Sequence, residues 1–110
     1  MTIKQLTKLI MTQADEKGFG ISTKDINVPE KIALIHAQLS SAYEGYRNKN
    51  MTGPYSFENE IAGTLQRIIH LCGVLDINIE KALLDKIKEN KSRKWDWKSL
   101  NEKHASKKKK

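Results

Sequence analysis

The recurrence of apolar residues at every third or fourth position is the feature that most constrains the fold of this chain. This spacing places the apolar side chains on one face of an α-helix. It occurs in four segments, which are separated by short stretches that contain Gly, Pro or Asn. No segment of useful length alternates apolar and polar residues as a half-buried strand would. The pattern predicts an all-α chain of four helices with short connections, which favours an antiparallel four-helix bundle.

Each predicted helix carries a start or stop signal and a set of inward-facing positions. The signals are Thr2 and Gly18 for the first helix, Pro29 for the second, Ser56 and Gly73 for the third, and Asp76 or Asn78 for the fourth. The inward-facing residues are Ile3, Leu6, Leu9, Ile10, Ile32, Ile35, Leu39, Ala42, Tyr46, Ile61, Leu65, Ile68, Ile69, Cys72, Leu75, Ile79, Ala82, Leu83 and Ile87. Because each helix has so few core positions, one chain is expected to leave an apolar face exposed. Pairing of copies would cover that face, so we expect a homodimer or a homotetramer.

The net charge of +7 is concentrated at the C-terminal end. From Lys86 onward the chain has eleven Lys or Arg against three Asp or Glu, whereas residues 1–85 are close to neutral. The composition predicts a helical domain over residues 1–98 and a basic, disordered tail over residues 99–110. Such a tail attracts nucleic acid through charge alone. It has no interleaved aromatic residues, so nucleic-acid binding is not the expected main function.

Cysteine usage and hydropathy bear on the cellular compartment. The single cysteine, Cys72, is surrounded by apolar residues, which indicates a packed thiol in a reducing compartment. No apolar run approaches the length of a membrane span. We therefore expect a cytoplasmic protein with no membrane partner.

Three segments of the chain resemble a known family. The segments "EKIALIHAQLSSAYEGYR", "FENEIAGTLQRIIHLCGVLDINIEKAL" and "DKIKENKSRKW" are similar to two signature helices and a closing segment of the MazG-like all-α nucleotide pyrophosphohydrolases. The order and spacing match over nearly the whole chain, and "GFG" at residues 18–20 resembles the family's loop after its first helix. The resemblance implies the all-α NTP pyrophosphatase fold. Members of the family hydrolyse nucleoside triphosphates to the monophosphate and pyrophosphate.

This chain differs from the family's pattern most in the catalytic motif. The motif is a Glu-x-x-Glu pair on one helix and a Glu-x-x-Asp pair on the next, and carboxylates spaced i, i+3 share a helix face. Four such carboxylates hold the Mg²⁺ ions that neutralise phosphate charge and activate water. The corresponding positions here are Gln38, Ser41, Glu60 and Gly63. Only Glu60 keeps a carboxylate, so the resemblance implies a vestigial metal site and no catalytic residue.

The family's substrate-binding series is retained. Lys86, Asn90 and Arg93 match it one for one, and Lys94 and Trp95 stand where the family usually has proline and tyrosine. Lysine and arginine bind phosphate without a metal. The ring of Trp95 either stacks on a base or packs onto the bundle. The leading hypothesis is a catalytically inactive MazG-like protein that sequesters or senses a nucleotide or related phosphorylated small molecule and requires no cofactor.

Two alternatives stay open. The first is a surviving pyrophosphohydrolase with an altered metal site, in which Glu60, Gln38, Glu44 and water hold one Mg²⁺ or Mn²⁺ ion. Pyrophosphate release that depends on metal and on Glu60 would identify it. The second is a helical interaction module whose basic tail binds nucleic acid or an acidic protein. Loss of that binding on deletion of residues 103–110 would identify it.

Overall fold

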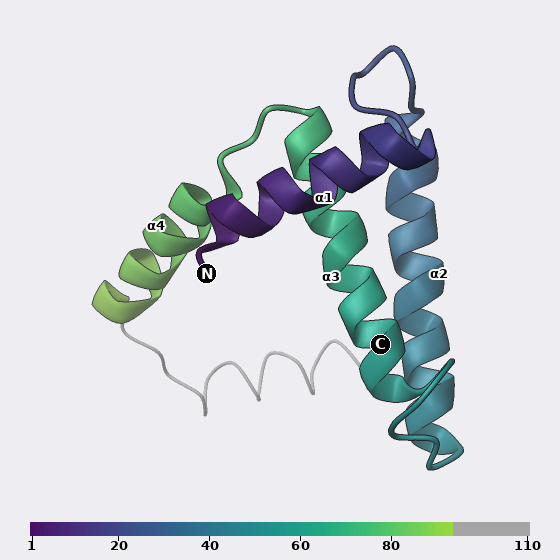
Figure 1. The fold of residues 1–110 in the computed structure, drawn as a ribbon. Helices are drawn as coiled ribbons and strands as arrows, with labels where there is room; N and C mark the ends of the chain where they lie inside the picture. The colour runs from purple at the N-terminus through teal and green to yellow at the C-terminus, as the bar shows by residue number, and fades with distance from the viewer. Residues whose placement is uncertain (94–110) are drawn as a thin grey trace, which may run out of the picture. The chain divides into compact units, whose positions relative to one another are not determined.

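The fold of the described residues is entirely helical. The computed structural model describes residues 1–93, which contain four helices and no strand (Figure 1). The helices are α1 (Ile3–Lys17), α2 (Val28–Arg47), α3 (Phe57–Val74) and α4 (Ile79–Ser92). Over residues 1–93 the predictions of an all-α chain and of four helices are therefore confirmed. No helix in this part of the chain is long and apolar enough to cross a membrane.

The helix ends follow local sequence signals at most of the predicted positions. The Thr2 hydroxyl accepts a hydrogen bond from the Gln5 backbone N–H, and the Gln5 side chain accepts one from the Thr2 N–H, which completes a capping box. Gly18 ends α1 in the left-handed conformation, at φ 75°. Pro29 lies in the first turn of α2, and the Ser56 hydroxyl caps α3. These predicted signals are confirmed.

The predicted stop at Gly73 is wrong. α3 continues through Gly73 to Val74, and Leu75 is its C-cap. The glycine is explained instead by packing, because a Cβ at this position would lie 2.7 Å from Cγ of Met11. Gly73 therefore allows α1 to approach the C-terminal part of α3.

Residues Met1–Glu80 form one compact unit. In it α2 and α3 lie side by side, and α1 crosses α3 (Figure 1). The backbone of α2 closely approaches the start of α3 at Gly45, where a Cβ would lie 2.8 Å from the backbone nitrogen of Phe57. The buried residues of the unit are Ala14, Ala42, Gly45, Ser56, Thr64, Ile69, Cys72 and Val74. This core is small, and α3 contributes half of it.

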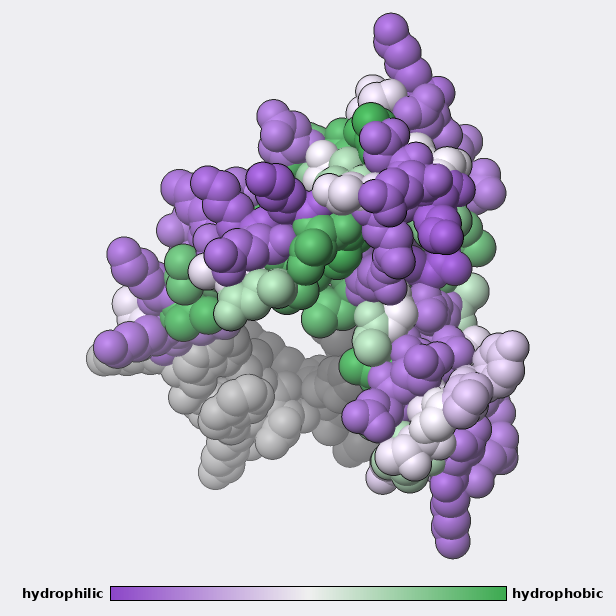
Figure 2. All heavy atoms as spheres, viewed as in Figure 1, coloured by the Kyte–Doolittle hydropathy of each residue, from purple (hydrophilic) through white to green (hydrophobic). Residues whose placement is uncertain are grey.

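Many of the predicted inward-facing residues are exposed. Leu39, Tyr46 and Leu65 are exposed to 50%, 59% and 55%. Figure 2 shows apolar side chains at the surface where α1 crosses α3. Single chains rarely leave so much apolar surface open to water. The sequence-based expectation that one chain leaves an apolar face exposed agrees with this finding.

From Lys81 onward the chain belongs to a second unit, of which the structure describes residues 81–93. Every residue in this range is exposed, including the apolar Leu83, Leu84 and Ile87. The predicted domain boundary after residue 98 and the predicted basic tail lie outside the described residues.

Candidate functional site

A cavity of about 310 Å³ opens among α1, α2 and α3, within the unit Met1–Glu80. Its volume lies at the lower end of the range for small-molecule sites. Phe19, Ile10 and Ala14 form its apolar lining. Its polar lining consists of Gln13, Lys31, Gln38, Gln66, Arg67 and His70. None of the residues that line the cavity is acidic.

Two of the four positions of the expected catalytic motif meet at this cavity. Gln38 of α2 reaches across to α3 at Gly63, where a Cβ would lie 2.9 Å from Cδ of Gln38. The side-chain amide of Gln38 thus occupies space that any side chain at position 63 would need. The absence of a side chain at position 63 and the position of the Gln38 amide are two aspects of one packing arrangement.

Arg67 is the third member of this arrangement. Its Nε donates a hydrogen bond of 2.6 Å to Oε1 of Gln38. Arg67 lies four residues after Gly63 and therefore on the same face of α3. The bond uses only Nε, so the two NH₂ groups of the guanidinium keep their donors. Within residues 1–93 no carboxylate forms an ion pair with Arg67.

Lys31 brings a second positive charge to the cavity. It is half-buried and lies on α2 two turns before Gln38, so both residues share one helix face. Among the residues that the structure describes, Lys31 has no ion-pair partner. The cavity thus combines two cations with the side-chain amides of Gln13, Gln38 and Gln66, and none of its lining residues carries a negative charge.

The loop after α1 closes one side of the cavity. Nε2 of His70 lies 2.8 Å from the Gly20 carbonyl oxygen, which can only accept, so Nε2 carries the proton. The backbone N–H of Phe19 donates to the Ala14 carbonyl oxygen at 2.8 Å. These two bonds hold the backbone of the loop on either side of the Phe19 side chain. Phe19 lines the cavity and remains 57% exposed.

The other two positions of the expected motif do not line this cavity. Ser41 lines a different cavity together with Glu44, and its hydroxyl donates to the Ala37 carbonyl oxygen at 3.3 Å. Glu60 is half-buried on α3 and lines neither cavity. Glu44 forms an ion pair with Arg47 at 3.3 Å. Over residues 1–93 no three His, Cys, Asp or Glu side chains are grouped so that they could hold a metal ion.

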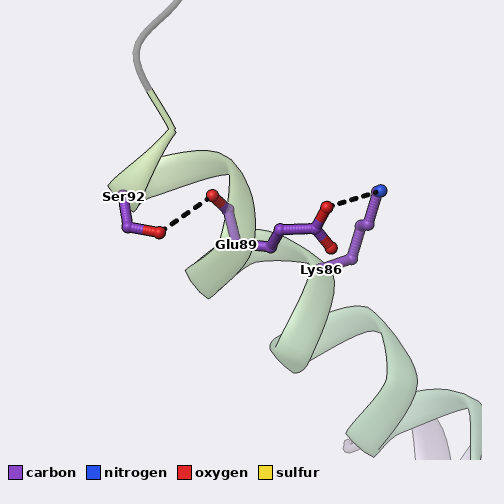
Figure 3. A network of polar contacts seen from close by, with 3 residues as sticks. All are labelled: Lys86, Glu89 and Ser92. Carbon is purple, nitrogen blue, oxygen red and sulfur yellow. Dashed lines mark hydrogen bonds and ion pairs between the residues drawn. The ribbon is translucent and has the colours of Figure 1, made fainter.

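Lys86 and Asn90 of the predicted phosphate-binding series lie on α4, and Arg93 directly follows it, all in the second unit. Lys86 forms an ion pair with Glu89 at 3.5 Å, and the Ser92 hydroxyl donates to the Glu89 carbonyl oxygen (Figure 3). The Lys86 and Glu89 side chains are 59% and 58% exposed. Asn90 is one turn beyond Lys86, and the Arg93 N–H donates to the Glu89 carbonyl oxygen at 3.1 Å. Lys94 and Trp95 lie outside the described residues.

Sequence reasoning missed Lys31 and Arg67. The available signal was their spacing, because each lies on the helix face of a position of the expected motif: Lys31 two turns before Gln38, and Arg67 one turn after Gly63. Comparison of the chain with protein-family models, with curated proteins and with solved structures gave no match.

Proposed function

We propose that this chain is a catalytically inactive, MazG-like protein that binds a nucleotide or related phosphorylated small molecule without a metal ion. The observation that carries the proposal is the composition of the cavity among α1, α2 and α3. Lys31 and Arg67 supply two positive charges to it, and no carboxylate lines it. Phosphate groups bind where cationic N–H donors converge.

The same composition argues against hydrolysis. Mg²⁺ takes oxygen ligands, usually carboxylates, and the cavity offers instead the amide of Gln38, the bare backbone of Gly63 and the guanidinium of Arg67. A cation bound there would be repelled by Arg67 and Lys31. The alternative site of Glu60, Gln38 and Glu44 has less support, because Gln38 and Glu44 line different cavities.

Two further parts of the proposal concern the bundle and its assembly. We take the four helices to form the antiparallel bundle of the all-α NTP pyrophosphatase type, and the exposed apolar residues of α2 and α3 support a homodimer or homotetramer. The series Lys86, Asn90 and Arg93 is retained as a candidate phosphate-binding group of α4. Alanine at Lys86 and Arg93 tests that group separately from the cavity.

A thermal-shift panel tests the proposed function. Nucleotides, linear and cyclic, are each tested with EDTA and with excess Mg²⁺ or Mn²⁺. A ligand at about a hundred times its dissociation constant adds about 2.7 kcal/mol to the unfolding free energy. We expect stabilisation that persists in EDTA and is reduced in Lys31→Gln, whereas Lys4→Gln, an exposed position on α1, leaves it unchanged.

Two results would contradict the proposal. One is stabilisation that appears only with a divalent metal, and the other is release of pyrophosphate that requires Glu60. Either result would favour the alternative hypothesis, a pyrophosphohydrolase with an altered metal site, over the proposed binding protein.

A further inference from the structure

The Gln38–Arg67 pair has the geometry of a prepared phosphate-binding group. An isolated arginine on a helix surface samples many rotamers, and ordering it on binding costs conformational entropy. Here the 2.6 Å bond from Nε to Gln38 fixes the plane of the guanidinium before any ligand arrives. The side chain is otherwise exposed, so its NH₂ groups are accessible from the cavity. A guanidinium presents these parallel donors to two oxygens of one phosphate.

The charge of the cavity selects the type of phosphate. Lys31 and Arg67 together contribute two positive charges. A phosphate monoester carries about 1.5 to 2 negative charges at neutral pH. A phosphodiester, such as the phosphate of a cyclic nucleotide, has no second ionisable oxygen and carries a single charge. The monoester therefore matches the cavity, and the diester leaves one cation without a partner.

The volume and the aromatic lining select the rest of the ligand. The cavity volume of about 310 Å³ is that of a site for one small ligand. Phe19 is exposed and lines the cavity, and hydrogen bonds of the backbone on either side of it hold its loop in place. Every nucleobase has a π-face that stacks on such a ring.

We infer that the Gln38–Arg67 pair takes the role that a divalent metal has in a hydrolase, and that its ligand is a nucleoside monophosphate bound in metal-free form. The inference rests on the proposed function and specifies its ligand class. Arg67 and Lys31 bind the phosphate monoester, Gln38 positions Arg67, and Phe19 contacts the base.

Calorimetric titration in EDTA tests the inference. The probes are AMP, GMP, CMP and UMP, the corresponding 3′,5′-cyclic monophosphates, and the nucleosides. We expect at least one monophosphate to bind the wild-type protein at least tenfold more tightly than its cyclic form, and its nucleoside to show no binding. Equal affinity for the cyclic form would overturn the monoester assignment.

Three variants test which side chains bind the phosphate. Arg67→Gln is expected to weaken monophosphate binding roughly tenfold to a hundredfold, as for a lost charge-assisted hydrogen bond. Gln38→Glu is expected to weaken it similarly, because the new carboxylate pairs with Arg67 and neutralises it. Arg47→Gln is the matched control, since Arg47 is exposed on α2, pairs with Glu44 and does not line the cavity. Its affinity should equal that of the wild-type protein.

The outcomes separate this inference from the proposed function. If Arg67→Gln binds as tightly as Arg47→Gln, the role of Arg67 is refuted, while metal-free binding by the protein stands. If the wild-type protein binds none of these monophosphates and only larger nucleotides stabilise it in the thermal-shift panel with EDTA, the ligand class is refuted. If it binds no phosphorylated ligand in EDTA, the proposed function fails together with the inference.

Discussion

Replacing Gly63 with alanine should separate ligand binding from folding. A Cβ at position 63 would lie 2.9 Å from Cδ of Gln38, closer than such atoms come in real structures. The obstructing group is the end of a flexible side chain and not backbone, so Gln38 is expected to turn away. That movement breaks the 2.6 Å bond to Arg67 and leaves the guanidinium free to sample other rotamers.

The stability terms of this substitution nearly cancel. Gly63 lies in the interior of α3, where alanine is more favourable than glycine by about 1 kcal/mol. The hydrogen bond that is lost is solvent-exposed, and such a bond contributes about 1 kcal/mol net. The free energy of unfolding of Gly63→Ala should therefore stay within about 1 kcal/mol of the wild-type value. Loss of the fixed Arg67 should cost about 1 kcal/mol in binding, which is roughly a fivefold weaker affinity.

Urea denaturation followed by circular dichroism measures the first quantity, and calorimetric titration with the best nucleoside monophosphate in EDTA measures the second. Unchanged affinity in Gly63→Ala would show that Gln38 does not prepare Arg67 for binding. A loss of stability above about 3 kcal/mol would show that Gly63 is required by helix packing, and the reasoning about a flexible obstacle would be refuted.

Three other predictions concern the packing of α2 and α3. Gly45→Ala places a Cβ 2.8 Å from the backbone nitrogen of Phe57, and a backbone atom cannot turn aside. Urea denaturation should therefore show a free energy of unfolding lower by about 1–3 kcal/mol, in contrast to the near-neutral result expected for Gly63→Ala. Ser56→Ala removes the fully buried cap that accepts the Asn59 N–H, and the same assay should show a loss of about 1 kcal/mol; an unchanged midpoint would contradict the capping role. Burial raises the pKa of the Cys72 thiol, so the folded state keeps a proton that the unfolded state has already lost. Below the ordinary thiol pKa the thiol is protonated in both states, and its contribution to stability is complete. As pH rises from that value through the raised pKa of the folded state, this contribution is lost and the measured free energy of unfolding should fall. Cys72→Ala should remove that part of the fall.

Helix content could be predicted because its signals are local. The capping box at Thr2, the left-handed residue Gly18 and the cap at Ser56 act within one turn of the residues that they stabilise. The prediction for Gly73 is wrong because the reason for a glycine at this position is not local in the sequence. A glycine late in a helix looks like a stop in the sequence, whereas its function is to admit Met11, which lies far away along the chain.

The candidate site could be predicted only in part. The motif spacing identified Gln38 and Gly63, and the fold brings these residues together. It did not identify Arg67 or Lys31, since a single cation on a helix usually faces solvent and its sequence neighbours do not reveal a cavity. Only the approach of α2 to α3 shows that both cations line one space. The role of Lys86, Asn90 and Arg93 stays a prediction, as does that of Lys94 and Trp95.

The most direct test of metal-free phosphate recognition is the affinity for a nucleoside monophosphate, measured by calorimetry first in EDTA and then in excess Mg²⁺. Because Lys31 and Arg67 supply the positive charge, the free anion should bind at least as tightly in EDTA as in Mg²⁺, and Glu60→Gln should bind like the wild-type protein. If binding requires Mg²⁺ and is lost in Glu60→Gln, the site is a metal site and the account is contradicted.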